Sequence, residues 1–229
     1  MPTKTTPKNA ASARFGSLQS RVQNAISLSS KTAKVSKSFL DRASKQKDPA
    51  DQAFWMGMAA YEAKDFCSAR EFLQQSFELK PNAETAARLS MTGYRSKDLR
   101  FAEKWIRTAL EMDAQGVFRA HVLGFDVNYR SVLAIVLVEL GQTSEGVAMA
   151  EAVIASTPDP VSLRARAMAR LDGGDTKGAQ TDLEKALKFA PDTLTSEITT
   201  DIELIRRLRE SNLGGVPFVS GRIICAWPV

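Results

Sequence analysis

The chain has 229 residues, of which 44% are hydrophobic, enough for one domain or one short repeat array with tails. Two cysteines and no run of 18 apolar residues argue against a disulfide framework and a membrane span. The start lacks the apolar segment of a secretory signal, so we expect a cytoplasmic protein. The net charge of +5 is uneven, because residues 1–48 hold ten lysines and arginines against two aspartates, a net charge of +8.

The N-terminal arm, residues 1–48, combines a polar start with two helical patterns. Residues 1–14 are Lys, Thr, Pro, Ala and Ser, which predicts disorder. Apolar residues then recur at helical spacing, which predicts an amphipathic helix over about 16–29 and a second short helix ending near 45. The stripe of the first helix consists of Phe15, Leu18, Val22 and Ile26.

Three interpretations of this arm remain open. Its apolar stripe can pack on the domain that follows, leaving a solvated tail. Its basic residues can attach the chain to nucleic acid or to another acidic surface through phosphate contacts. A basic, Ser-rich segment that is poor in acids is also typical of an organellar transit peptide.

From residue 50 onward, helices are expected in pairs. The predicted pairs are 50–63 with 66–79, 83–95 with 99–112, 127–140 with 143–156, and 160–172 with 176–189. A last apolar stripe predicts a helix over about 193–211 that covers the open end of the array. Asn82 is a candidate N-cap, and Asp159 with Pro160 indicates an N-cap followed by a first helical residue.

The pairs carry small residues and prolines at repeating offsets. Small residues sit where two antiparallel helices would cross, at Gly57, Ser90, Ala134 and Ala167 and again at Ala69, Ala102, Gly146 and Ala179. The copies close at Pro81, Ala114, Pro158 and Pro191, which are 33, 44 and 33 residues apart. Over residues 50–193 this pattern resembles the tetratricopeptide repeat, whose period is about 34 residues.

The resemblance implies an all-α, right-handed solenoid of about four helix pairs with a C-terminal capping helix. We therefore expect a basic arm over 1–48, a solenoid over 50–212 and an apolar tail over 213–229. The spacing of 44 places an insertion near 117–126. We predict that its apolar residues Phe118, Val122 and Phe125 pack against neighbouring repeats.

The tail is rich in apolar and β-branched residues, with Phe218, Ile223, Ile224 and Trp227 among them. We expect it to fold back in extended form onto the last repeats or the concave face. The alternative is that a partner, or a second copy of the chain, receives it, which would make the tail a route to self-association.

No catalytic or ligand motif stands out. His121 is the single histidine of the sequence, so histidine-based triads and zinc motifs are unsupported. The stretch 172–175, Asp-Gly-Gly-Asp, falls where the repeat needs a turn and lacks EF-hand spacing. We expect neither an enzyme nor a bound metal or cofactor.

The resemblance also implies a concave binding surface, lined by the second, fifth, ninth and twelfth positions of each first helix. Phe54 and Met58 stand where chaperone-binding members of the family carry Lys and Asn, so a carboxylate clamp is not carried over. The groove is apolar and Met-rich instead, which suits an apolar peptide or amphipathic helix. The candidate partner-binding residues are Phe54, Met58, Tyr61, Met91, Tyr94, Ile135, Arg164 and Met168.

Two functional classes therefore remain. The first is a non-catalytic adaptor or chaperone-like scaffold that binds a protein or peptide partner in the groove, unless the chain's own tails fill it. The second is a protein associated with nucleic acid or an acidic surface through the N-terminal arm. A steep salt dependence of binding would favour the second class, because phosphate contacts release counterions.

Overall fold

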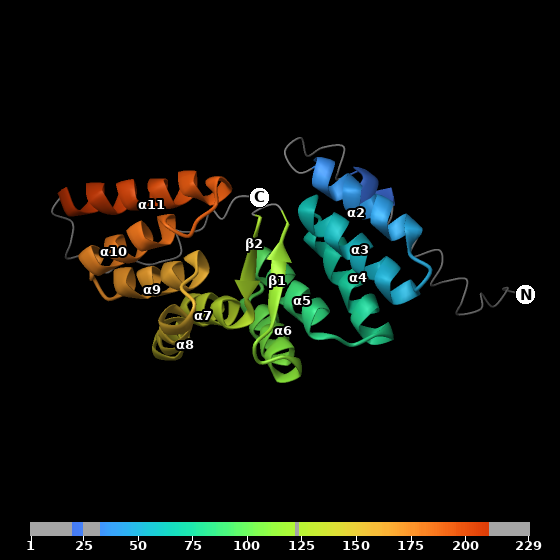
Figure 1. The fold of residues 1–229 in the computed structure, drawn as a ribbon, viewed down its shortest axis with the longest axis horizontal. Coiled ribbons are helices and arrows are strands. Elements are labelled where there is room, and N and C mark those ends of the chain that lie inside the picture. The colour runs from blue at the N-terminus through green and yellow to red at the C-terminus, as the bar shows by residue number, and fades with distance from the viewer. Residues whose placement is uncertain (1–19, 25–32, 122–123, 211–229) are drawn as a thin grey trace, which may run out of the picture. The chain divides into compact units, whose positions relative to one another are not determined.

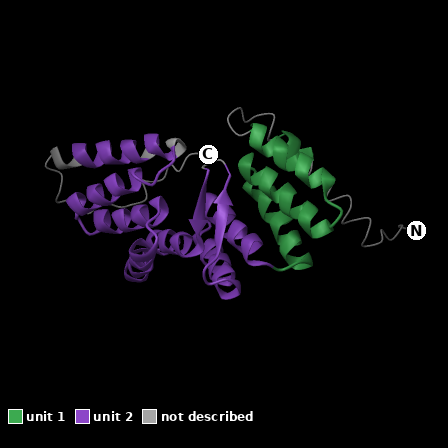
Figure 2. Cartoon of the chain, in the orientation of Figure 1, with its two compact units in different colours: residues 1–81, 229 green, residues 82–228 purple. Residues whose placement is uncertain are grey.

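The structure is a computed structural model that describes residues 20–24, 33–121 and 124–210. The chain divides between Pro81 and Asn82 into two compact units, unit 1 and unit 2, shown in different colours in Figure 2. Unit 1 includes the described part of the predicted arm together with the first helix pair, and unit 2 holds the remaining pairs. The predicted disorder of residues 1–14 and the predicted tail, 213–229, lie outside the described residues.

Both units are built mainly from helices that pack against their neighbours in sequence (Figure 1). Unit 1 contains α2 (Ala33–Lys45), α3 (Pro49–Glu62) and α4 (Phe66–Leu79), together with a helical stretch over residues 20–24. Unit 2 contains α5 (Ala83–Arg95), α6 (Leu99–Met112), α7 (Tyr129–Glu139), α8 (Thr143–Ser156), α9 (Pro160–Asp172), α10 (Thr176–Leu187) and α11 (Asp192–Glu210). The predicted helix pairs and the last helix are confirmed to within about two residues.

The predicted insertion carries the two short strands that the structure describes within a mostly helical fold. Here β1 (Val117–Ala120) and β2 (Phe125–Asn128) form an antiparallel hairpin in which Phe118 lies opposite Val127. Phe118 and Val127 are buried, whereas the paired Arg119 and Asp126 are exposed and lie 3.3 Å apart. This alternation of apolar and polar residues is the period of a strand, so the segment closes as a ribbon.

The hairpin is anchored through Phe118, as predicted for this residue. The ring of Phe118 stacks on Tyr129 of α7, and the guanidinium carbon of Arg88 in α5 lies 4.5 Å from its centroid. Arg88 also donates to the Arg119 carbonyl at 2.8 Å, which joins α5 to the backbone of β1. Phe125 is half-buried, and Val122 lies outside the described residues.

Within each helix pair the turn has the same geometry. One residue takes a positive φ, and the amide that follows it donates to a carbonyl five residues earlier, at 2.8–3.0 Å. This bond satisfies a carbonyl at the end of the first helix. The positive-φ residues are Lys64, Lys97, Gly141 and Gly174, so they recur at the spacing of the closing positions.

An N-cap follows directly after most of these turns. The side chains of Asp65, Asp98 and Asp175 each accept a backbone hydrogen bond from three residues ahead. Gln142 stands at the corresponding position before α8 and makes no side-chain cap bond. Before the first helices, Asn82 and Asp159 cap α5 and α9, which confirms both predicted caps.

The small residues lie where the paired helices cross. All eight are buried, and at the two glycines among them an added Cβ atom would collide with the partner helix. A Cβ atom at Gly57 would lie 2.6 Å from Leu73 Cγ, and one at Gly146 would lie 2.9 Å from the Ala134 carbonyl oxygen. The two helices of a pair therefore approach closely because these positions carry almost no side chain.

The N-terminal helices complete the core of unit 1. Val22, Phe39 and Ala43 belong to one buried cluster with Met56, Met58, Ala59, Ala60, Ala69 and Phe72. The half-buried Val35 and Leu40 of α2 pack against this cluster. Of the four residues of the predicted apolar stripe, Val22 lies within the described residues, and it is buried in this cluster.

We predict that Gly57→Leu lowers the free energy of unfolding by about 1–3 kcal/mol, because the new side chain overlaps Leu73. Gly173→Ala is the matched control, since its added Cβ would meet its nearest atoms at 3.6 Å with an ordinary φ of −82°. Chemical denaturation of both variants measures the difference. Equal stability of Gly57→Leu and the parent protein would contradict the close approach of α3 and α4.

We predict that Gln142→Asp stabilises the protein by about 1 kcal/mol, because it supplies the side-chain acceptor that α8 lacks at its N-cap. The reverse change, Asp175→Ala, removes the cap of α10 and should destabilise by a similar amount. Thermal unfolding monitored by circular dichroism would record shifts of opposite sign. A fall in melting temperature for Gln142→Asp would contradict the shared geometry of these turns.

Candidate partner-binding site

The first helices of unit 2 form a connected row, α5–α7–α9–α11, which we call the inner row. Each helix makes a polar contact with the next one in the row. Tyr94 joins α5 to α7, Ser131 joins α7 to the N-cap of α9, and Arg164 joins α9 to α11. Helices that are alternate in sequence are thus linked directly. In addition, α5, α7 and α9 pack against their own second helices, and α11 packs against α10.

The contact between α5 and α7 centres on Glu139. The Tyr94 hydroxyl donates to Glu139 Oε1 at 2.5 Å, and Lys97 Nζ lies 3.4 Å from Glu139 Oε2. The same Lys97 amine lies 5.5 Å from the centroid of the Tyr94 ring. A short hydrogen bond to a carboxylate in a sheltered position is a strong contact, so this group fixes the C-terminal ends of α5 and α7 together.

The contact between α7 and α9 is a buried hydroxyl network. Ser131 donates to Asp159 Oδ2 at 2.6 Å, and Ser162 lies 2.8 Å from both Ser131 Oγ and Asp159 Oδ2. Asp159 Oδ1 accepts the amides of Val161 and Ser162, which cap α9. One carboxylate therefore caps a helix and ties it to its neighbour.

The contact between α9 and α11 is a buried ion pair. Arg164 Nη2 lies 3.3 Å from Asp201 Oδ2, and the two side chains are only 4% and 9% exposed. Burial raises the pKa of Asp201, while the charge of Arg164 and its hydrogen bond act in the opposite direction. Leu194, Ile198 and Ile205 are also buried on α11.

Five of the candidate partner-binding residues lie on the inner row, and their exposure differs. Met91 of α5 is half-buried and retains accessible surface. Tyr94, Ile135, Arg164 and Met168 are all buried. Met91 is thus the member of this group that a partner reaches without rearrangement of the described side chains.

The other three candidates, Phe54, Met58 and Tyr61, lie in unit 1. Met58 is buried in the core cluster, and Phe54 and Tyr61 are half-buried against it. Phe54 makes an edge contact with Trp55 at 5.1 Å. Since Val22 and Phe39 occupy the same cluster, the N-terminal helices of the chain itself pack where a partner was expected.

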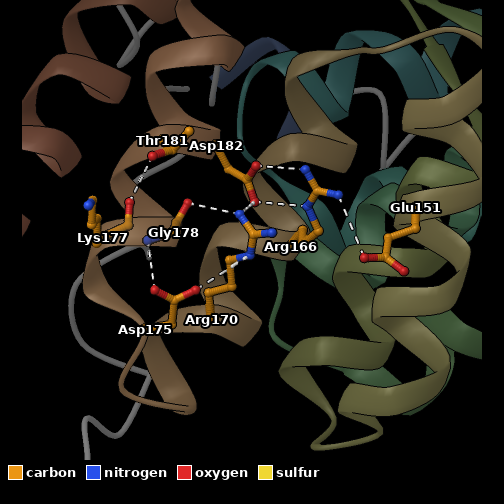
Figure 3. Close-up of polar contacts among 8 residues, drawn as sticks. All are labelled: Glu151, Arg166, Arg170, Asp175, Lys177, Gly178, Thr181 and Asp182. Atoms are coloured by element: carbon orange, nitrogen blue, oxygen red, sulfur yellow. Dashed lines mark hydrogen bonds and ion pairs between the residues drawn. The ribbon is translucent and has the colours of Figure 1, made fainter.

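The sequence reasoning missed a polar cluster between α9 and α10, shown in Figure 3. Asp182 is fully buried and accepts two bonds from Arg166, at 2.7 and 2.9 Å, and Arg170 Nη1 lies 2.8 Å away. The hydrogen bond from Arg166 to Asp182 is the main cause of the raised pKa of Arg166. The signal in the sequence is an aspartate directly before the core residue Leu183, on the face of the second helix that turns inward.

A second missed feature is a set of exposed apolar residues at the ends of second helices. Leu79, Met112 and Phe189 are exposed, and each lies two residues before a position that closes a copy of the repeat, namely Pro81, Ala114 and Pro191. Val117, at the start of β1, is also exposed. The equivalent position thus presents apolar surface in three of the four copies, whereas the third copy carries Ser156 there.

Two kinds of site are not found among the described residues. Among residues 20–24, 33–121 and 124–210, no three His, Cys, Asp or Glu side chains gather as a metal site. Within the same ranges, no helix is both long and apolar enough to span a membrane. Cys67 is an exposed free thiol.

Comparison with known proteins does not add a relative. No protein-family model matches the chain, and no curated protein matches it.

We predict that Arg166→Ala destabilises the protein by about 3–5 kcal/mol, because it leaves the buried Asp182 with a weakened set of partners. The double change Arg166→Met with Asp182→Leu removes the buried charge as well and should lose markedly less. Urea unfolding of the single and double variants measures both. If the double variant is less stable than Arg166→Ala, this cluster is not held together by charge compensation.

Proposed function

We propose that this chain is a non-catalytic adaptor or chaperone-like scaffold that binds an apolar peptide or helix of a partner protein. In this proposal the inner row is the lining of a tetratricopeptide-like groove in a right-handed solenoid. The protein acts by holding a partner, so it needs no cofactor and carries out no reaction. We place it in the cytoplasm, in keeping with its two widely separated cysteines.

The observation that carries this proposal is the direct linkage of α5, α7, α9 and α11. Stacked helix pairs place their first helices side by side, which creates an extended surface built from rigid elements. The contacts through Tyr94, Ser131 and Arg164 link each first helix to the next. The positive-φ turns at matching positions give each pair the same geometry.

The chemistry of the accessible lining favours an apolar partner. Met91 supplies a flexible, polarisable side chain there, whereas Ile135 and Met168 are buried. Arg164 is already neutralised by Asp201, so it does not offer a free charge for a terminal carboxylate. An amphipathic helix or an extended apolar segment fits such a surface better than an acidic tail does.

We predict that Met91→Asp reduces partner capture at least tenfold, because a carboxylate at the accessible edge of the inner row is costly to desolvate. Met112→Asp is the matched control, since Met112 is a 47% exposed methionine of the same unit outside the inner row. Affinity capture followed by titration of the captured partner would compare the two. Loss of binding in both variants, or in neither, would move the site elsewhere.

Among the buried candidate residues, Tyr94 can be tested in the same capture experiment only by a substitution that keeps its ring. Tyr94→Ala would remove the buried ring together with the hydroxyl that donates to Glu139, and this would disturb the fold. Tyr94→Phe is therefore the appropriate variant. It removes the hydroxyl and keeps the ring. Retained capture with a lowered melting temperature would assign Tyr94 a role in packing alone.

The role of the apolar tail remains a prediction, since residues 213–229 lie outside the described residues. If the tail folds back onto the protein, truncation after Asn212 should lower thermal stability and raise the affinity for an apolar partner. Thermal unfolding and sedimentation of the full and truncated chains measure the effect. Unchanged stability combined with lost self-association would assign the tail to a second copy of the chain instead.

A further inference from the structure

Helix α2 has two chemically distinct faces. Ser36, Phe39 and Ala43 are buried on one face, and Phe39 lies 5.4 Å from Trp55 of α3. Lys34, Lys37 and Lys45 are exposed on the other. At 3.6 residues per turn these lysines fall on one side of the helix, over an axial distance of about 16 Å.

Other charged side chains lie near this face, and several of them have a partner. Arg42 is exposed, with its guanidinium carbon 4.9 Å from the Trp55 ring, so it is held against α3. Asp41 is the acidic residue of α2 and lies among the lysines. Lys47 follows the helix and is exposed, whereas Asp48 pairs with Lys80 of α4 at 3.3 Å. Arg21 pairs with Asp65 at 3.4 Å.

The three lysines of this face differ in that respect. Within the part of the chain that the structure describes, no ion pair involves Lys34, Lys37 or Lys45. They also lie in the segment of the sequence that carries a net charge of +8. The face is therefore a strip of solvated positive charge.

We propose that this lysine face of α2 binds the phosphate backbone of a nucleic acid without reading its sequence. Nucleic acids carry dense, regularly spaced negative charge, and lysines bind phosphate as point charges. The inference is independent of the proposed function, because that function rests on unit 2 and this face belongs to unit 1.

The composition of the face favours phosphate over the other acidic partners. Protein interfaces are enriched in aromatic residues and arginine and depleted in lysine, which is the reverse of what α2 exposes. A membrane-surface helix inserts an apolar face, but the apolar residues of α2 pack into the core cluster of unit 1 and against α3. The exposed side chains of α2 are therefore charged or polar, and none of them is apolar.

The test uses the full chain and the triple change Lys34→Glu, Lys37→Glu and Lys45→Glu. Fluorescence anisotropy with a labelled 20-base-pair DNA duplex and a labelled single-stranded RNA, at several salt concentrations, measures affinity. The triple variant should bind at least tenfold more weakly. Its plot of log affinity against log salt should be shallower by about two to three, since each phosphate contact contributes about 0.9.

The matched control is Lys177→Glu, Lys185→Glu and Lys188→Glu, which changes the net charge equally at three exposed lysines of unit 2. It should keep most of the affinity and the parent slope. An equal loss in both triple variants would overturn the proposal, because general charge would then explain binding. So would an absence of binding by the parent chain at low salt.

A parallel measurement uses vesicles of phosphatidylcholine with and without phosphatidylserine. Binding to the anionic vesicles with no binding to either nucleic acid would overturn the proposal and assign the face to membranes. Melting temperatures of both triple variants verify folding. Should the glutamate variant not fold, Lys34→Gln, Lys37→Gln and Lys45→Gln removes the charges more mildly, and unchanged nucleic-acid affinity would again overturn the proposal.

Discussion

The close approach of the two helices in each pair is the constraint on which the rest of this structure depends. At Gly57 and Gly146 any further side-chain atom would collide with the partner helix, so the backbones themselves are in contact range. Close backbone approach buries the apolar residues on either side and fixes the direction in which the chain leaves the pair. The positive-φ turn then becomes a geometric requirement, which is why it recurs in all four pairs, and an aspartate N-cap follows it in three of them.

Polar contacts then organise the helices beyond the pairs. The row from α5 to α11 is joined through buried or sheltered carboxylates, each of which has a hydroxyl or guanidinium partner. A buried carboxylate without a partner carries a large desolvation penalty, so these contacts select one arrangement of neighbouring helices. Hydrophobic burial alone tolerates sliding of one pair against the next. The carboxylates therefore specify the register of the proposed groove.

The hairpin between α6 and α7 shows how an insertion can be absorbed without breaking the array. Tyr129 begins α7 and stacks on Phe118, and a Cβ atom at Gly116 would collide with the Tyr129 ring. Burial raises the pKa of Tyr129 to about 12, with further contributions from nearby carboxylates. The ribbon thus contributes a buried aromatic contact to unit 2, and its polar face, with Arg119 and Asp126, remains exposed.

The sequence by itself determined the helix pairs, the caps Asn82 and Asp159 and the small residues of the repeat, because these features depend on local chemistry and on a period that repeats. Tertiary structure alone decided which apolar residues remain accessible. Met91 and Met168 look equivalent in the repeat, yet one is half-buried and the other buried, since exposure depends on every element packed around a residue. The hairpin, the Asp182 cluster and the pairing of Arg164 with Asp201 likewise join residues whose contacts no local pattern encodes.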